Sequence, residues 1–589
     1  ETDALTINGS ALKYKAFGTG SIMFGDDATG TISSADSNTG VGVDVFAALT
    51  QGDSNVAIGH SAMNATTTGI DNVAVGTSAL AAQTTGGDNV AIGHLAMSTL
   101  TTAGNNVAVG DRAMQASTSG ENNVAVGTLA MDANTTGGSN VGVGRDALGA
   151  NTTGSNNTAV GKSALNTTTT SSNNTGIGFQ ALYTLNGGVS NAALGHNALF
   201  NATTADNNVA VGKSAMENVT SGSNNVAVGK DALDATTTAD NNTAVGASAL
   251  TTNTTGANNV AMGFAALQLA TTASDNTALG YAALNANTTG ASNTAIGRDA
   301  LDANTTADHN VAVGKESLTT NTTGTQNTAI GNFSLALSTT SNDNSAVGYS
   351  ALIANTTGYG NSGVGKDALK GVTSGYGQTA LGERAGEDAT TGAANVFVGN
   401  ESGEDLTTGI GNVFVGYQTE SFGGNSNYQI VLGFDTKSVG DATTFTFGRG
   451  NGNNRVHNNF DSNASFTRVS DVRYKDEIQD NTDCGLAFIN DLRPVTFKWR
   501  AKADIDSSLP DYDADATERT HDAKLYGLIA QEVKESLDKH NITDFGGWFQ
   551  GEQDGIQGVS QEMFVHPLIK AVQELSAKID DLESKLDGE

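Results

Sequence analysis

A strict internal repeat, without insertions, is the feature that most constrains the fold of this chain. The pentapeptide Asn-Val-Ala-Ile-Gly at 55–59 returns as Asn-Val-Ala-Val-Gly at 72–76, and a glycine stands at every seventeenth position from Gly25 to Gly433. This grid of glycines marks 25 repeats. Because a fixed period indicates one structural unit stacked on itself, it overrides the several globular domains that 589 residues would otherwise suggest.

Each repeat places the same residue types at the same positions relative to its glycine. An asparagine lies four residues before it, a large apolar residue directly before it, and a leucine or methionine four residues after it, as in Asn106, Val109 and Met114 around Gly110. The Val-Ala-Val alternation suits a short strand with one buried face. We expect two such strands in each coil, joined by Thr-Thr-Gly corners, because Gly and Asn tolerate the left-handed backbone of tight turns.

The repeat therefore predicts a mostly β chain with a long parallel β-solenoid, or β-roll, over residues 25–433. Coils spaced like strands in a sheet would extend over about 120 Å. Aligned asparagines would form a ladder of amides along the fibre. The handedness of the solenoid stays open.

A single coil is thin, because it offers only about two large apolar side chains. A lone solenoid of this kind would bury little and would expose columns of apolar residues along its length. Association of several chains around a shared axis would cover these columns. We therefore expect a homo-oligomer, and a homotrimer before any other state.

The formal net charge of −32 argues against nucleic acid and against an anionic membrane surface as partners. Cys484 is the only cysteine, so an intrachain disulfide is excluded. No apolar run is long enough for direct membrane insertion. The sequence begins at Glu1 without a signal-peptide pattern, so we expect a processed or shortened chain with a virion or surface anchor upstream.

The composition changes near the end of the repeats and again at Ser470. In the last repeats phenylalanine enters at Phe397 and Phe414, and the leucine after the glycine is lost. We divide the chain into an N-terminal lead-in, the solenoid shaft, a β connector or tip, and a small α+β domain, over residues 1–24, 25–433, 434–469 and 470–589.

The C-terminal domain shows the patterns of an ordinary globular fold. Residues 492–500 predict a strand after a proline turn, and residues 526–537 predict a strand that leads into an amphipathic helix. A heptad seam follows in a helix over about 567–587, at Leu568, Val572, Leu575, Ile579, Leu582 and Leu586. This seam predicts a short coiled coil. Its β-branched residues Val572 and Ile579 favour a dimer in isolation, and we let the longer β region decide for a trimer.

The repeat is similar to the head repeats of trimeric autotransporter adhesins, and closer still to repeats of phage tail fibres. The pentapeptide at 55–59, followed by a small residue and a leucine or methionine, carries this resemblance. The adhesin family implies a left-handed parallel β-roll in a homotrimer, although the coil here is longer than is usual in that family.

The C-terminal domain resembles the S74 peptidase family, the intramolecular chaperones of phage tailspikes and fibres. Four segments carry the resemblance in the expected order: SDVRYKDEI from Ser470, LRPVTFKW, GLIAQEV and the terminal heptad helix. The resemblance implies that Ser470 is the nucleophile, Lys475 the base, and the bond between Val469 and Ser470 the cleavage site.

The resemblance further implies that the Ser-Lys pair acts once, in cis, after three domains have assembled. The base must be neutral near pH 7, and a nearby positive charge lowers the pKa of a lysine, so Arg473 would support Lys475. Asp471 would order the local turn. An enzyme that turns over external substrate is not expected.

Other candidate sites have simpler explanations. Asp511, Asp513 and Asp515 alternate as in a calcium-binding loop, but Ala516 stands where that loop needs glycine, so we interpret the segment as a solvated acidic loop. The carboxylate pairs at 387–388 and 404–405 suggest glycan cleavage, but they recur at the repeat period and so belong to a column. We expect no metal and no cofactor.

Together with the repeat, these resemblances imply a trimeric phage tail fibre on the virion that attaches to a host cell-surface receptor, either glycan or protein. A bacterial trimeric adhesin at the cell surface, or a structural spacer fibre with a non-cleaving chaperone domain, is the alternative. A tailspike depolymerase would need an insertion off the repeat grid with convergent carboxylates, and the sequence shows none.

Overall fold

The computed structural model describes residues 6–7, 10–11, 14–16, 18–25, 34–440, 442–451, 454–459, 467–468, 476–509, 512–519, 523–551 and 555–588. Two compact units make up the chain, Glu1–Val469 and Ser470–Glu589. Each unit has its own hydrophobic core.

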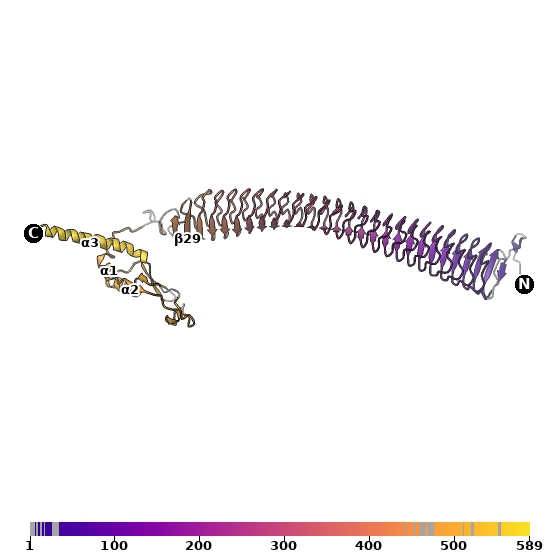
Figure 1. Cartoon of the computed structure of the whole chain (residues 1–589), viewed down its shortest axis with the longest axis horizontal. Coiled ribbons are helices and arrows are strands. Elements are labelled where there is room, and N and C mark those ends of the chain that lie inside the picture. The colour runs from indigo at the N-terminus through magenta and orange to yellow at the C-terminus, as the bar shows by residue number, and fades with distance from the viewer. Residues whose placement is uncertain are drawn as a thin grey trace. The chain divides into compact units, whose positions relative to one another are not determined.

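The first unit is a solenoid built on one parallel sheet, in which 25 strands follow each other in chain order (Figure 1). Neighbouring strands pair at an offset of one repeat, as in Val56↔Val73. The strands are β4 (Ile22–Gly25), β5 (Thr39–Gly42), β6 (Val56–Ile58), β7 (Val73–Val75), β8 (Val90–Ile92), β9 (Val107–Val109), β10 (Val124–Val126), β11 (Val141–Val143), β12 (Thr158–Val160), β13 (Thr175–Ile177), β14 (Ala192–Leu194), β15 (Val209–Val211), β16 (Val226–Val228), β17 (Thr243–Val245), β18 (Val260–Met262), β19 (Thr277–Leu279), β20 (Thr294–Ile296), β21 (Val311–Val313), β22 (Thr328–Ile330), β23 (Ser345–Val347), β24 (Ser362–Val364), β25 (Thr379–Leu381), β26 (Val396–Val398), β27 (Val413–Val415) and β28 (Ile430–Phe434).

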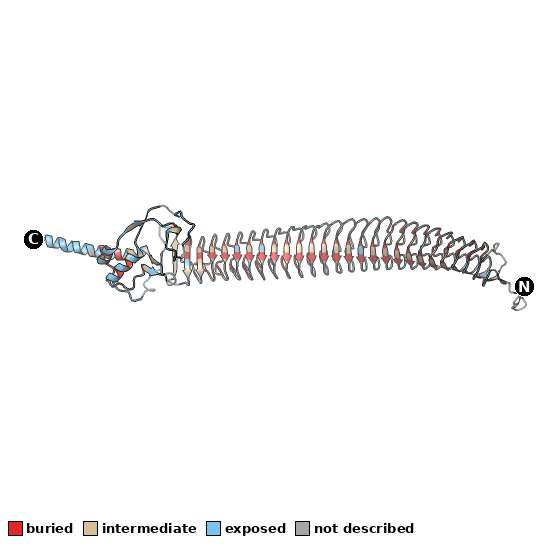
Figure 2. Ribbon diagram, turned by 90° about the horizontal axis from the view of Figure 1, so that it is seen from below, coloured by how far each residue is buried: buried red, intermediate tan, exposed pale blue. Residues whose placement is uncertain are grey.

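The central residue of each strand lies in the core, as the alternation predicts. In β6 the small side chain of Ala57 is fully buried, whereas Val56 and Ile58 point outward. In most coils the larger core side chains come from the fourth residue after the grid glycine, such as Met63 and Leu80, both with 0% exposure. Figure 2 shows the buried strand residues as a line along the sheet. The core is therefore a column of alanines packed against a column of leucines and methionines.

The expectation of two strands in each coil is wrong, because each coil contains one short strand among the residues that the structure describes. The rest of the coil turns, and the second and fourth residues after the glycine adopt left-handed backbone angles, with φ of 57° at Ser61 and 50° at Met63. A left-handed residue cannot continue a strand, and it costs about 1–2 kcal/mol when it is not glycine. Burial of the leucine or methionine at the fourth position offsets that cost.

The grid glycines are required by close contact between successive coils. Gly246 has φ of 138°, a conformation that side chains rarely adopt. A Cβ atom there would lie 2.3 Å from the carbonyl oxygen of Gly263 in the next coil. The same conflict recurs along the grid, which explains why a glycine stands at every one of these positions.

The predicted asparagine ladder is confirmed. Asn72 is fully buried, and its Nδ2 donates to Oδ1 of Asn55 at 3.0 Å and to the carbonyl oxygen of Gly86 at 3.0 Å. Its backbone nitrogen also donates to Oδ1 of Asn55, at 3.1 Å. Each amide thus satisfies polar groups in its own and neighbouring coils, which a buried polar column requires.

Short strands flank the 25-strand sheet at both ends. β3 (Tyr14–Ala16) pairs antiparallel with β4, and β1 (Thr6–Ile7) pairs with β2 (Ser10–Ala11). At the other end β29 (Thr444–Arg449) extends the parallel sheet, but it pairs Phe445 with Ile430, an offset shorter than one repeat. β30 (Arg455–Asn459) and β31 (Thr467–Arg468) then add antiparallel strands.

The second unit is a small α+β fold whose described residues form two antiparallel strand pairs and three α-helices. Its elements are α1 (Leu486–Asp491), β32 (Val495–Phe497), η2 (Lys502–Asp504), β33 (Leu525–Gly527), α2 (Ala530–Lys539), β34 (Trp548–Gln550), β35 (Gln557–Val559), η3 (Gln561–Phe564) and α3 (Val565–Leu586). The strand over 492–500, the strand-to-helix segment over 526–537 and the terminal helix are confirmed. The core is centred on Phe488, whose ring packs against Phe545 and Phe564 with centroids 5.7 and 6.3 Å away.

Candidate functional site

The predicted cleavage site lies outside the described residues. This holds for all five residues of that prediction: Val469, Ser470, Asp471, Arg473 and Lys475. The boundary between the two compact units falls between Val469 and Ser470. The geometry of the Ser-Lys pair therefore stays a prediction. The described residues of the C-terminal unit follow this pair in the sequence.

The N-terminal half of the long helix α3 is anchored to the rest of this unit. Glu574 on α3 accepts a hydrogen bond from the backbone nitrogen of Leu486 at 2.8 Å, at the first residue of α1. A carboxylate at this place satisfies a free helical N–H group and favours the positive end of the helix. Ala571 of α3 is buried beside it. The first half of α3 is thus part of the fold.

Two ion-pair groups hold α2 against the segment around α1. Arg493 pairs with Glu532 through two hydrogen bonds, one of them 3.0 Å from Nε to Oε2, and this contact lowers the pKa of Glu532. Asp491 lies 2.7 Å from Nζ of Lys539 and 2.5 Å from Nε2 of His540, and these partners lower its pKa. Because water screens exposed ion pairs, these pairs add little to the stability of the fold. Their main role is to orient α2 relative to the segment around α1.

The apolar seam of α3 is not covered by any described part of the chain. The seam residues Leu568, Val572, Leu575, Ile579, Leu582 and Leu586 are between 46% and 73% exposed. Soluble monomers rarely expose so regular a row of large apolar side chains. The row is the surface that a coiled coil would bury.

The solenoid carries a second uncovered apolar row, on the outer face of its sheet. The residue directly before each grid glycine is Val, Ile, Leu, Met or Phe in all 25 coils. Many of these side chains are substantially exposed, including Ile58 at 39%, Leu194 at 49% and Leu381 at 53%. The charged side chains of the solenoid lie at other positions, so the row is continuous.

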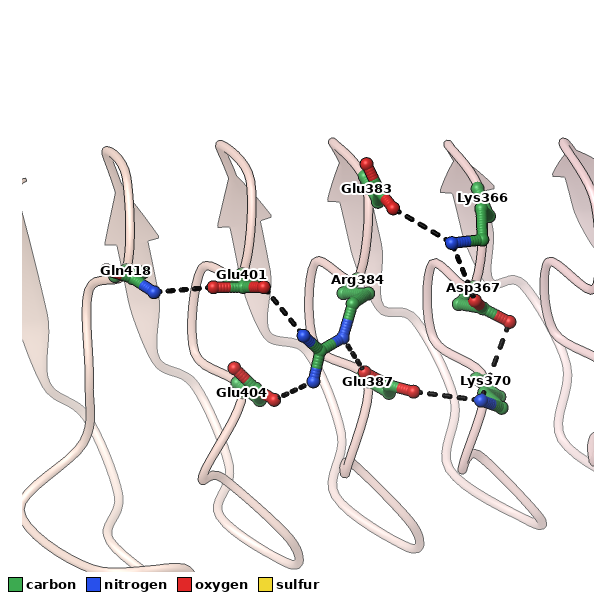
Figure 3. Close-up of polar contacts among 9 residues, drawn as sticks. All are labelled: Lys366, Asp367, Lys370, Glu383, Arg384, Glu387, Glu401, Glu404 and Gln418. Carbon is green, nitrogen blue, oxygen red and sulfur yellow. Dashed lines mark hydrogen bonds and ion pairs between the residues drawn. The ribbon is translucent and has the colours of Figure 1, made fainter.

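A cluster of charged side chains joins the last coils of the shaft (Figure 3). Arg384 contacts Glu387 in its own coil and both Glu401 and Glu404 in the next, with 2.6 Å between Nη1 and Oε1 of Glu401. Lys370 adds a contact of 3.0 Å to Glu387. Burial raises the pKa of Glu387, but hydrogen bonds from Arg384 and Lys370 outweigh it and hold that pKa below its usual value.

This arrangement explains the carboxylate pairs that the sequence shows at 387–388 and 404–405. Arg384 neutralises Glu387 and Glu404 in one structural cluster, which joins two coils. An open hollow of about 370 Å³ lies beside it, lined by acidic residues and by Lys437, which lies 3.0 Å from Glu420 and 3.4 Å from Asp405. Inspection of the sequence missed Arg384; comparison of the second and fifth positions after each glycine would have found it.

The described residues show no further kind of site. Among them no group of three or more His, Cys, Asp or Glu side chains could hold a metal ion. No described helix is long and apolar enough to cross a membrane. The pKa of Cys484 is raised, first by burial and then by Asp483, so the thiol there is poorly reactive.

Comparison with known proteins gives one result. Residues 470–542 match the peptidase S74 family model, described as the chaperone of endosialidase. The match begins at Ser470 and ends just after α2, so that α3 lies beyond it. No curated protein and no solved structure matches the chain. The long β-solenoid and the chaperone-type C-terminal domain together fit a tail-fibre-like protein.

Proposed function

We propose that this chain is one subunit of a homotrimeric phage tail fibre that attaches to a host cell surface. The solenoid forms the shaft, an anchor protein of the virion holds its upstream end, and the C-terminal domain assembles three chains. The receptor is a glycan or protein of the host. No nucleic acid and no membrane insertion takes part.

The observation that carries the proposal is the pair of uncovered apolar rows. One row follows the sheet through all 25 coils, and the other follows α3. Both belong to elements that run over long distances, so only a long partner with a matching row can cover either of them. A second and a third copy of this chain offer that match by symmetry.

The chaperone-type match supports an assembly role for residues 470–589. Because the coils repeat one sequence pattern so regularly, neighbouring chains can align equally well in several registers. Three chains therefore need a domain that aligns them at one end. Helix α3 brings the chains together through Val572, Leu575 and Ile579. Propagation of the solenoid from there keeps the three chains in register.

We further propose that the domain cleaves itself from the shaft before Ser470. The match to the family begins at this residue. Ser470 acts as the nucleophile and Lys475 as its base, with Arg473 lowering the lysine pKa and Asp471 ordering the turn. Release of the domain after assembly removes the route back to unfolded chains, and the stability of the fibre becomes kinetic.

The intact mass of the denatured protein tests the cleavage. We expect the wild type to give two fragments that meet between Val469 and Ser470, whereas Ser470→Ala stays at 59.6 kDa. Ser507→Ala, at an exposed serine of the same unit, is the matched control and should be cut like the wild type. An uncut wild type would exclude the self-cleaving fibre and favour a bacterial surface adhesin or spacer fibre whose C-terminal domain is permanent.

A further inference from the structure

The coils of Gly178 and Gly195 depart from the repeat at several outward positions at once. Every coil packs the same kind of core, so core packing does not explain changes at outward positions. Such changes indicate that these positions serve a purpose other than packing. Three outward columns are affected, formed by the first, second and fifth residues after each grid glycine. We call this face, between Lys162 and Glu217, the mid-shaft face.

The first column carries most of the positive charge of the shaft. Seven of the ten Lys and Arg residues between 25 and 433 directly follow a grid glycine. Five of these seven form an ion pair with the acidic residue next to them, as in Arg145–Asp146 at 3.2 Å and Lys230–Asp231 at 2.7 Å. The other two, Lys162 and Lys213, are followed by serine, and the described residues provide no ion pair for either.

Two exposed rings occupy the first column between these two lysines. Phe179 and His196 stack with centroids 5.1 Å apart and an angle of 27°, and Phe179 is 39% exposed. Nζ of Lys162 lies 5.7 Å from the centre of the Phe179 ring. The second column beside the rings is neutral and polar, with Gln180 and Asn197.

The fifth column of the same coils adds a second pair of rings. Tyr183 and Phe200 are parallel within 5°, with centroids 5.1 Å apart. The second and fifth columns are adjacent, because Nδ2 of Asn197 donates to Oε1 of Glu217 at 3.4 Å. An open groove begins at the next position along the coil and is lined by hydroxyl and amide groups, including those of Thr184, Asn201 and Asn218.

We propose that the mid-shaft face binds an acidic saccharide, one whose sugar rings carry carboxylate or sulfate groups. Lys162 and Lys213 are three coils apart, roughly 14 Å along the axis, and attract the negative groups. The rings offer apolar surface to sugar C–H groups, and the amides and hydroxyls offer hydrogen bonds to sugar hydroxyls.

The inference rests on the proposed attachment function, because it names a receptor class and a place on the shaft. Such a saccharide is either part of a cell-surface polysaccharide or free in the medium. Long and short forms of one probe separate the two sources. A surface polymer binds more tightly as the long form, because several copies of the shaft engage one polymer.

Binding to the full-length protein tests the proposal, with dextran sulfate and alginate as acidic probes and plain dextran as the neutral match. We expect both acidic probes to bind and plain dextran not to bind, with affinity falling as salt screens the lysines. Lys162→Gln combined with Lys213→Gln should weaken binding about tenfold or more. Phe179→Ala should weaken the binding of both acidic probes as well.

A matched pair elsewhere in the first column provides the control. Phe264 and Tyr281 also stack, with centroids 5.4 Å apart. The next basic residue in the first column, Arg298, is paired with Asp299 at 2.9 Å. Replacement of both rings by alanine should leave binding unchanged. All substituted side chains are on the surface, so the variants should fold, and circular dichroism checks this.

Three results would overturn the proposal: equal binding of dextran and dextran sulfate, no loss in the lysine variant, or an equal loss in the control variant. Tighter binding of duplex DNA than of dextran sulfate would overturn the saccharide assignment too. Light scattering on the same samples reports assembly separately. A fibre that assembles but binds no acidic probe would contradict this inference alone. A monomer that binds the acidic probes would contradict the proposed function but would still support saccharide binding by the mid-shaft face.

Discussion

The ring of Phe397 fills the place beside Gly386 where most coils put a leucine or methionine. A Cβ atom on Gly386 would lie 2.7 Å from Cδ2 of the ring. Phe397 stands where most other coils have the buried alanine of the strand, and Gly386 stands where most have the large core residue. The two exchanges keep the core volume roughly constant, and the ring also stacks on Phe414 with centroids 5.7 Å apart.

This exchange predicts compensation between the two positions. Phe397→Ala should leave a cavity that costs about 3–5 kcal/mol, and Gly386→Leu should overfill the core at a cost of about 1–3 kcal/mol. The double variant restores the common residues at these two positions and should be more stable than Phe397→Ala. Hydrogen exchange of the coils around Val396–Val398 measures the effect. A double variant whose loss equals the sum of the single losses would contradict the account.

The grid glycines predict a sharp difference between two glycine substitutions. Gly246→Ala places a Cβ 2.3 Å from a backbone oxygen and should destabilise the surrounding coils by about 3 kcal/mol or more. Gly360 has φ of 65° and open space around it, so Gly360→Asn should be tolerated. Local hydrogen exchange should show lost protection for the first variant only. Equal behaviour of the two would mean that the coils can move apart.

The asparagine ladder predicts that one gap in the column is costly. Asn225 donates to Oδ1 of Asn208 at 3.2 Å and accepts from Asn242, so Asn225→Ala leaves buried groups on both sides without partners. We expect a loss of about 2–4 kcal/mol of local stability. Asn218→Ala is the control, since among the described residues its outward amide pairs with Asn201 alone, and the next coil has Ala235 there. A similar protection pattern in both variants would argue against the ladder.

The carboxyl group of Asp234 predicts a pH dependence. Burial, then the charges of Glu217 and Asp231, raise its pKa to about 6 in the folded chain. A raised pKa means that the folded state holds this proton more tightly than the unfolded state does. The contribution of the proton to the free energy of unfolding is therefore full below pH 4 and is lost as the pH rises through 6. The side chain is only partly buried, so the effect should be about 1 kcal/mol.

Asp234→Asn should therefore stabilise the protein at pH 7.5 and lose that advantage near pH 4. The midpoint of guanidinium denaturation measured at the two pH values checks this. Asp302, with a pKa raised by burial and by Asp299, should show the same sign. A benefit of Asp234→Asn that is as large at pH 4 as at pH 7.5 would show that charge is not the cause.

Much of the fold follows from the period alone. A glycine at every seventeenth position and the alternation around it predict stacked parallel coils, and the columns predict the amide ladder. The conformation of the coil could not be predicted in the same way. Met63 and Leu80 adopt left-handed angles, against their intrinsic preference, because the core behind them offsets the cost, and that balance is a property of the packed coil.

The candidate sites divide in the same manner. The seam of α3 is visible in the heptad spacing of Leu568, Val572 and Leu575. The cluster around Arg384 and the mid-shaft face are not local in sequence, since their members are one or more repeats apart. Alignment of the repeats against one another reveals both, because it compares columns and not neighbours. The Ser-Lys pair stays a prediction from the resemblance of its flanking segments.

The mass of the native particle in light scattering tests the assembly of three chains most directly. We expect three times 59.6 kDa, or three times the mass of residues 1–469 once the C-terminal domain has left. Leu575→Glu should reduce the yield of trimer by charging the seam, whereas Ser576→Glu, one residue away on the same helix, should not. A wild type that stays at 59.6 kDa, with both apolar rows exposed to water, would contradict the account.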